Sequence, residues 1–197
     1  VDPLYTLPFL FCLIIASRMS RQSRWRRFFN RMGIAVSCLY LLFTFYNKWR
    51  VTQVFKHSFA AERLEYKRMV TVPTILNNFL WQGIAEGDTA FYQGHYSIFD
   101  PEPVVRQINV LPKNHHLLEG HAEDSDIRTV RWVTNQMYNL TPRADGRLQL
   151  NHLRYGIMRP EYTGPRDYVF YWIVGPDSTA GEWTARPDPA SREFSQE

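Results

Sequence analysis

The sequence predicts an α+β protein, in which two N-terminal transmembrane helices precede a small domain with a mainly antiparallel β-sheet and one or two helices. Residues 3–17 and residues 32–47 contain no charged side chain. The segment between them, residues 18–31, holds six arginines and no acid. Residues 48–197 are polar and show strand-like and helix-like periodicity in turn.

The second apolar stretch is long enough to cross a bilayer. A spanning helix needs about 20 largely apolar residues, and residues 28–47 meet this length with Arg31 near one end, where its side chain can snorkel. The first stretch is shorter and contains Pro8, which weakens it as an independent span. A pair of buried helices in a soluble protein is the alternative. We expect a helical hairpin whose partner is the lipid bilayer.

The arginine-rich segment indicates the orientation of this hairpin. Short cytoplasmic loops are enriched in Lys and Arg, so residues 18–31 are expected in the cytoplasm. Asp2 and everything after Asn47 then lie on the far side of the membrane, although three basic residues soon after Asn47 argue weakly the other way. An arginine cluster between two apolar stretches is not typical of a nucleic-acid surface, and we expect no nucleic-acid partner.

Residues 48–65 have helical periodicity, with apolar side chains at Val51, Val54, Phe55 and Phe59 on one face. This segment is expected to continue the second membrane helix as a stalk. The domain organisation that follows is a transmembrane hairpin at 1–47, an amphipathic stalk helix at 48–66, a β-rich soluble domain at 67–175 and a poorly ordered tail at 176–197.

The β-rich domain is expected to begin with a hairpin, because Glu86-Gly87-Asp88 is a turn signal between two segments of alternating hydrophobicity. The tail is rich in Pro, Ser, Asp and Glu, which predicts disorder. The expected elements are strands at 74–85, 89–99 and 108–111, a helix at 124–139, and strands at 148–157 and 168–174.

A histidine-rich stretch is the densest candidate metal site. His115, His116 and His121 lie close to several acids, and such side chains are the ligands that transition metals prefer. The spacing from His116 to His121 matches neither a helical pair nor a zinc signature, so we expect these residues to contact solvent. His95 and His152 alternate with apolar neighbours and are expected to be packed or surface histidines. No metal site is predicted within this chain.

Several segments in the β-rich half resemble the C-terminal half of the YdjM-like family, bacterial proteins described as membrane-bound, metal-dependent hydrolases, some of them regulated by LexA. The matching segments are PTILNNFLW at 73–81, GHYSIFD at 94–100 and LRYG at 153–156. The opening VDPLYTLP, the arginine-rich segment and LYLL at 39–42 are also similar, so the resemblance runs from residue 1 to about residue 174.

The chain departs from this family in one respect. The residues thought to bind metal lie upstream in the family, in a His-x-x-x-Asp motif and a later helix with His and Asp, and this chain contains neither. Asp2 is the one candidate for that polar face, and hence for a catalytic role. Its alternative role is an acid at a helix N-terminus, with Pro3 in the first helical position. The fragment is therefore expected to be inactive alone, with any divalent metal bound by the longer parent.

The outer domain also contains candidate substrate-binding residues. Thr74 and Asn77 could line a cleft that faces the membrane-embedded site, and Trp81 and Tyr96 could form an aromatic wall as cross-strand neighbours. The remaining candidates are Asp100, and Arg154, which could bind Asp100 or an anionic substrate group. The alternative is structural, with Asn77 and Asp100 closing turns and Arg154 in an ordinary ion pair.

Two classes of function follow. The resemblance implies a multi-pass hydrolase of the bacterial inner membrane, in which the extracytoplasmic domain is a lid or recognition module for a lipid-linked or envelope substrate. In such an enzyme a metal-activated water is the nucleophile, and the upstream transmembrane helices of the parent are partners of this chain. The alternative is a non-enzymatic, membrane-anchored binding or structural domain.

Overall fold

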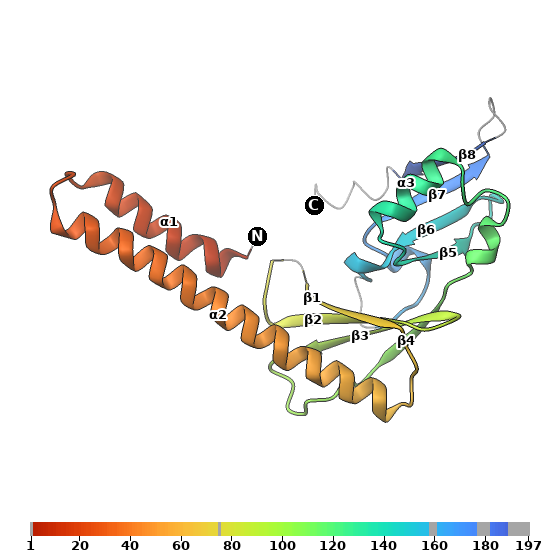
Figure 1. Ribbon diagram of the computed structural model, residues 1–197, viewed down its shortest axis with the longest axis horizontal. Coiled ribbons are helices and arrows are strands. Elements are labelled where there is room, and N and C mark those ends of the chain that lie inside the picture. Colours follow the sequence, from red (N-terminus) through yellow and green to blue (C-terminus); the bar gives the residue numbers. More distant parts are fainter. Residues whose placement is uncertain (1, 75, 158–160, 177–181, 189–197) are drawn as a thin grey trace.

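The computed structural model describes residues 2–74, 76–157, 161–176 and 182–188. It is an α+β protein with two four-stranded antiparallel sheets, in which a helical hairpin projects from one side of the first sheet (Figure 1). Sheet A has the order β1-β2-β3-β4 and sheet B the order β5-β6-β7-β8. The prediction of antiparallel pairing is confirmed, whereas the expected single sheet is in fact two.

The long helix α2 (Arg24–Ala61) runs for 38 residues without a break. Its N-terminal half is long and apolar enough to cross a membrane, and only 11% of the residues in that apolar stretch are buried. α1 (Pro3–Arg18) has 16 residues and folds back along α2, with Cys12 and Phe9 lying over Gly33 (Figure 1). Because α1 is shorter than the roughly 20 residues that a span requires, the structure supports one of the two predicted transmembrane helices.

The C-terminal half of α2 belongs to the core of the domain that contains the two sheets. Val51, Phe55 and Phe59 are fully buried on the predicted apolar face and pack against Trp81 and Tyr96 of sheet A. The expected helix here is continuous with the apolar half of α2, and it lies across sheet A, where its apolar face is removed from water. The helix ends at Ala61, five residues before the expected boundary at residue 66.

Sheet A consists of β1 (Arg68–Pro73), β2 (Leu80–Glu86), β3 (Ala90–Ser97) and β4 (Ile108–Pro112). The predicted hairpin is confirmed, with Trp81 opposite Tyr96 and Gln82 opposite His95. The expected strand at 74–85 starts later, at Leu80, because the Asn77 side chain closes a turn just before it. β1 was not predicted.

Sheet B consists of β5 (Tyr138–Pro142), β6 (Leu148–His152), β7 (Tyr171–Pro176) and β8 (Trp183–Pro187). α3 (Ser125–Val133) covers one of its faces and ends before the expected residue 139, because Asn135 and Gln136 take the left-handed conformation. Short 3-10 turns are η1 (His115–Leu118), η2 (Leu153–Tyr155) and η3 (Pro165–Asp167). β8 lies in the segment where disorder was expected; residues 177–181 and 189–197 of that segment are outside the described residues.

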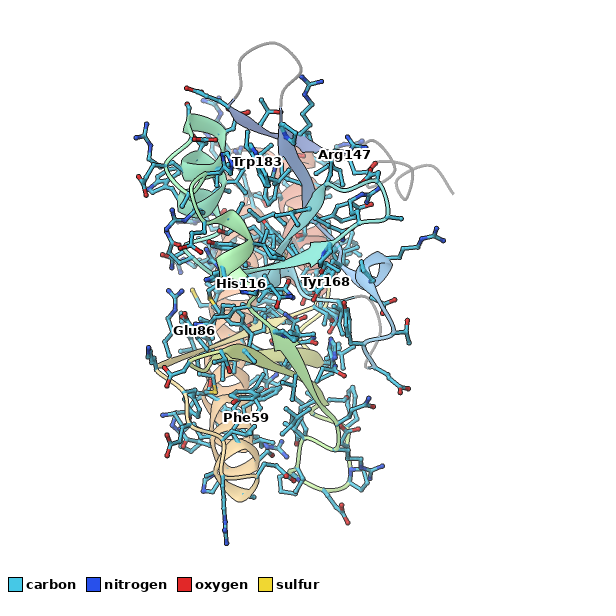
Figure 2. All side chains as sticks on the ribbon, turned by 90° about the vertical axis from the view of Figure 1, so that its right-hand side faces the viewer. Phe59, Glu86, His116, Arg147, Tyr168 and Trp183 are labelled. Atoms are coloured by element: carbon cyan, nitrogen blue, oxygen red, sulfur yellow. The ribbon has the colours of Figure 1, made fainter. Side chains whose placement is uncertain are left out.

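The domain is layered, with α2, sheet A, sheet B and α3 following one another. Figure 2 shows Phe59 beside α2 at one end and Trp183 beside α3 at the other, with Tyr168 between the sheets. A central cluster that includes Ile84, Leu153 and Tyr168 joins the two sheets. Alternation along β2 and β3 explains this order, since Trp81 and Tyr96 face α2 while Gln82 and His95 face sheet B.

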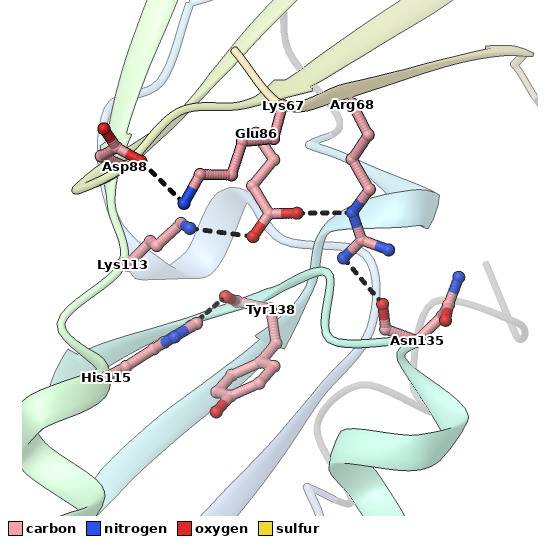
Figure 3. Close-up of polar contacts among 8 residues, drawn as sticks. All are labelled: Lys67, Arg68, Glu86, Asp88, Lys113, His115, Asn135 and Tyr138. Atoms are coloured by element: carbon pink, nitrogen blue, oxygen red, sulfur yellow. Dashed lines mark hydrogen bonds and ion pairs between the residues drawn. The ribbon is translucent and has the colours of Figure 1, made fainter.

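Glu86 at the end of β2 binds two cations of the sheet A side, one of which also reaches the segment before sheet B (Figure 3). It accepts hydrogen bonds from the Arg68 guanidinium and from Lys113 Nζ, the latter at 2.8 Å. Arg68 also donates to the main-chain oxygen of Asn135, 2.9 Å away, just before sheet B. Burial raises the pKa of Glu86, but hydrogen bonds from Lys113 and Arg68 outweigh it and the net pKa is lower than usual.

Replacing Glu86 with glutamine is expected to lower the free energy of unfolding by about 2 kcal/mol, because two partly buried cations lose their counterion. The lowered pKa predicts that this stabilisation is complete above pH 4.5, the usual value, and is lost as the pH falls below it. Urea unfolding at several pH values measures both effects. The matched control is Asp88→Asn, whose ion pair with Lys67 is fully exposed to solvent. Equal stability of the two variants would contradict the assigned role of Glu86.

Candidate functional site

A cavity of about 880 Å³ lies between the two sheets, and we call it the inter-sheet cavity. Its walls come from β1, β2 and β3 on one side and from α3, β6, η2 and β7 on the other. Most of the lining is apolar, as is usual for small-molecule sites. The apolar lining residues are Val72, Pro73, Leu80, Val133, Ile157, Val169, Phe170 and Trp172.

A small set of polar side chains converges on this cavity: Thr74, Gln82, His95, His152, Arg154 and Tyr155. Gln82 is buried and donates from Nε2 to the Leu153 carbonyl, 3.3 Å away, which ties β2 to the start of η2. Arg154 follows in the same turn and is exposed to solvent. The arrangement places one cation, two imidazoles and an amide around a mostly apolar space.

The two histidines are held uncharged at neutral pH. Burial lowers the pKa of His95. Burial also lowers the pKa of His152, and the nearby charge of Arg154 acts in the same direction, whereas a contact with the Val133 main chain opposes it. The Nδ1 atoms of both rings are buried and have no hydrogen-bond partner within the described part of the chain. Such unpaired polar atoms are uncommon in folded proteins and are found at functional sites.

A second cavity of about 340 Å³, the hairpin cavity, lies where the helical hairpin meets the loop between β1 and β2. Asp2, Tyr40, Thr44 and Asn77 are among its lining residues. It shares Pro73 and Thr74 with the inter-sheet cavity, and the two spaces are therefore adjacent.

Asp2 has structural partners for both of its carboxylate oxygens. One oxygen accepts a hydrogen bond from the Leu4 main-chain N–H at 2.9 Å, which makes Asp2 the N-cap of α1 with Pro3 in the first position. The other accepts a hydrogen bond from the Tyr40 hydroxyl of α2. The alternative role considered for Asp2, a helix-terminal acid, is thus present in the structure, and the same side chain lines the hairpin cavity.

The predicted substrate-binding residues separate into two groups. Thr74 and Arg154 line the inter-sheet cavity, and Thr74 and Asn77 line the hairpin cavity. Trp81 and Tyr96 are cross-strand neighbours, as expected, but they are completely buried against α2 and do not reach either cavity. Their large side chains fill the core between helix and sheet.

The turn-forming roles considered for Asn77 and Asp100 are also observed. Asn77 Oδ1 accepts hydrogen bonds from the Phe79 and Leu80 main chains at 3.0 and 2.8 Å. Asp100 accepts a hydrogen bond from the Ser97 N–H at 2.9 Å. Within the described residues, no ion pair links Asp100 to Arg154.

The histidine-rich stretch is used for packing. His115 stacks on Tyr138 at 4.2 Å between ring centroids, and its Nε2 lies 2.9 Å from the Tyr138 carbonyl. His121 stacks on Trp183 and contacts Asp124. The described residues contain no group of three or more His, Cys, Asp or Glu side chains that could hold a metal ion.

Three functional candidates were missed in the sequence: Gln82, His95 and His152. The sequence signal for Gln82 and His95 was the alternation of side chains along a strand. Each is next to Trp81 or Tyr96 in the chain and therefore points to the opposite face of the sheet.

Comparison with protein-family models, with curated proteins and with solved structures found no match.

Proposed function

We propose that this chain is the C-terminal part of an integral-membrane, metal-dependent hydrolase of the bacterial inner membrane, in which the two-sheet domain recognises the substrate outside the cytoplasm. The observation that carries the proposal is the adjacency of the two cavities, which share Pro73 and Thr74. A ligand bound between the sheets would lie beside the helical hairpin and its carboxylate, Asp2. The resemblance to the YdjM-like family supports the hydrolytic activity.

The residues that the structure describes do not make up a complete metal site. Asp2 offers a single carboxylate, and both of its oxygens already accept hydrogen bonds. A divalent metal in the longer protein would therefore need ligands from upstream helices, where it could activate a water molecule. The role that we assign to this chain is recognition: apolar walls hold the substrate, while Arg154, Gln82 and His95 orient its polar end.

The test uses the longer protein that contains this chain, reconstituted in nanodiscs. We expect a bound divalent metal by elemental analysis and hydrolysis of a lipid-linked substrate. Arg154→Gln should raise KM, and Asp2→Asn should lower kcat. Absence of bound metal, together with unchanged behaviour of both variants, would overturn the hydrolase.

A non-enzymatic, membrane-anchored binding domain is the second candidate. The hydrogen bonds of Asp2 favour this second candidate. They give Asp2 a purely structural role, because one oxygen caps α1 and the other binds Tyr40. In that case Asp2→Asn would loosen the helical hairpin without any effect on ligand affinity, whereas Arg154→Gln would still weaken binding.

A further inference from the structure

Building on the proposed recognition function, we propose that the inter-sheet cavity takes a phosphate-bearing lipid from the adjoining bilayer, with Arg154 binding the phosphate and the apolar lining receiving an acyl chain. Three features of the cavity favour such a lipid: the charge of its lining, the composition of its rim and its position relative to the apolar half of α2.

The charged lining of the cavity is entirely basic within the described residues. Arg154 is its one permanently charged side chain, and no acidic side chain lines the space. No hydrogen bond or ion pair to the Arg154 side chain is described, and its guanidinium is thus available to a ligand. A guanidinium matches the geometry of a phosphate because it can donate two parallel hydrogen bonds.

His95 offers an imidazole to the same cavity. Its Nδ1 is buried and has no hydrogen-bond partner among the described residues. Gln82, directly opposite on β2, is already bound to the Leu153 carbonyl and fixes the turn that carries Arg154. These polar lining residues thus come from two strands and a short turn, which the Gln82 hydrogen bond and the strand pairing hold together.

The rim of the cavity exposes large apolar side chains to solvent. Leu80, Val133, Tyr155 and Phe170 all line the space and are between 39% and 56% exposed. Tyr155 and Phe170 contact each other edge to face at 4.6 Å. Side chains of this size at an opening are typical of a site for an apolar partner, and aromatic rings prefer the interface between lipid and water.

The cavity lies on the side of the domain that faces the apolar helix. Its neighbour, the hairpin cavity, is lined by Tyr40 and Thr44 of the stretch of α2 that is long and apolar enough to span a membrane. The loop between β1 and β2 is fastened to this stretch, because Asn78 donates to Thr44 and its carbonyl accepts from Asn47. With α2 in a bilayer, the opening lies at the height of the lipid headgroups, and a lipid can enter it without crossing water.

The experiment uses the whole chain in dodecyl maltoside micelles, which contain no phosphate, and measures binding by calorimetry. The probes are dihexanoyl phosphatidic acid, the uncharged dihexanoylglycerol and inorganic phosphate. We expect phosphatidic acid to bind at least about tenfold more tightly than either of the others, since charge-assisted hydrogen bonds to the phosphate add to apolar burial.

Arg154→Gln should reduce the affinity for phosphatidic acid about tenfold or more and leave dihexanoylglycerol unchanged. Unchanged binding of the uncharged probe also shows that the variant is folded. The matched control is Arg106→Gln, an equal change of charge at an exposed arginine outside both cavities.

The outcomes separate this inference from the proposed function. Equal affinity for both amphiphiles, unaffected by Arg154→Gln, would overturn the phosphate contact but keep a recognition site for apolar ligands. Inorganic phosphate binding as tightly as phosphatidic acid would overturn the lipid as ligand. If neither amphiphile binds, both the inference and the recognition function fail.

Discussion

Replacing Gly83 with alanine is expected to lower the free energy of unfolding by about 3 kcal/mol, at the upper end of what overpacking a core usually costs. A methyl group at this position would lie 2.3 Å from Cδ1 of Phe55, far inside van der Waals contact. Phe55 cannot retreat, since it is fully buried between α2 and the sheet. Gly83 pairs with Gly94 on β3, and the two glycines let α2 lie directly on the strands.

Urea unfolding of the whole chain, followed by tryptophan fluorescence, measures this effect. Gly164→Ala is the matched control, because its backbone is extended and nothing lies within 4 Å of the added methyl group. The control should be unchanged or up to about 1 kcal/mol more stable, because alanine restricts the unfolded chain. Combining Gly83→Ala with Phe55→Leu should cost less than the sum of the two changes. A fully additive result would show that the ring is not the obstacle.

The parts of the fold that could be predicted are those that local periodicity determines. The apolar face at Val51, Phe55 and Phe59 repeats every three to four residues, and that spacing correctly placed a helix with one buried side. The turn at 86–88 correctly joined β2 to β3. Both signals are complete within about twenty residues, so neither depends on the rest of the chain.

The parts that were missed depend on distant partners. β1 was missed because its six residues are too few to show a clear period, and its pairing with β2 is evident only in the structure. The start of β5, residues 138–139, was assigned to a helix because Met137 and Tyr138 continue the helical spacing of α3. The helix α3 ends at two left-handed residues, Asn135 and Gln136, and no glycine or proline in the sequence marks this end.

Only part of the candidate site could be predicted, because the site also depends on partners that are distant in the sequence. Arg154 and Thr74 were selected as polar residues within the segments that resemble the YdjM-like family, and both line the inter-sheet cavity. His95 and His152 were expected to be packed or surface residues, because alternation shows which face a side chain takes but not what lies opposite. A second sheet facing the first one turns these two positions into the walls of one cavity.

Replacing Gly156 with alanine is expected to lower the free energy of unfolding by about 3–5 kcal/mol through backbone strain and overpacking together. Its φ of 74° and ψ of −156° lie in a region that essentially only glycine adopts. An added methyl group would also lie 1.6 Å from Oε1 of Gln82. Gln82 would have to leave its hydrogen bond to the Leu153 carbonyl, the contact that positions the turn carrying Arg154.

The loss of ligand binding should therefore accompany the loss of stability. Gly120→Ala separates the two causes, because Gly120 also has a positive φ, of 86°, but no neighbour within 4 Å of the added methyl group. This control should lose only about 1 kcal/mol, the cost of the left-handed backbone, and should retain its affinity for phosphatidic acid. If Gly156→Ala behaved like Gly120→Ala in both measurements, the close approach of Gly156 to Gln82 would have no part in building the cavity.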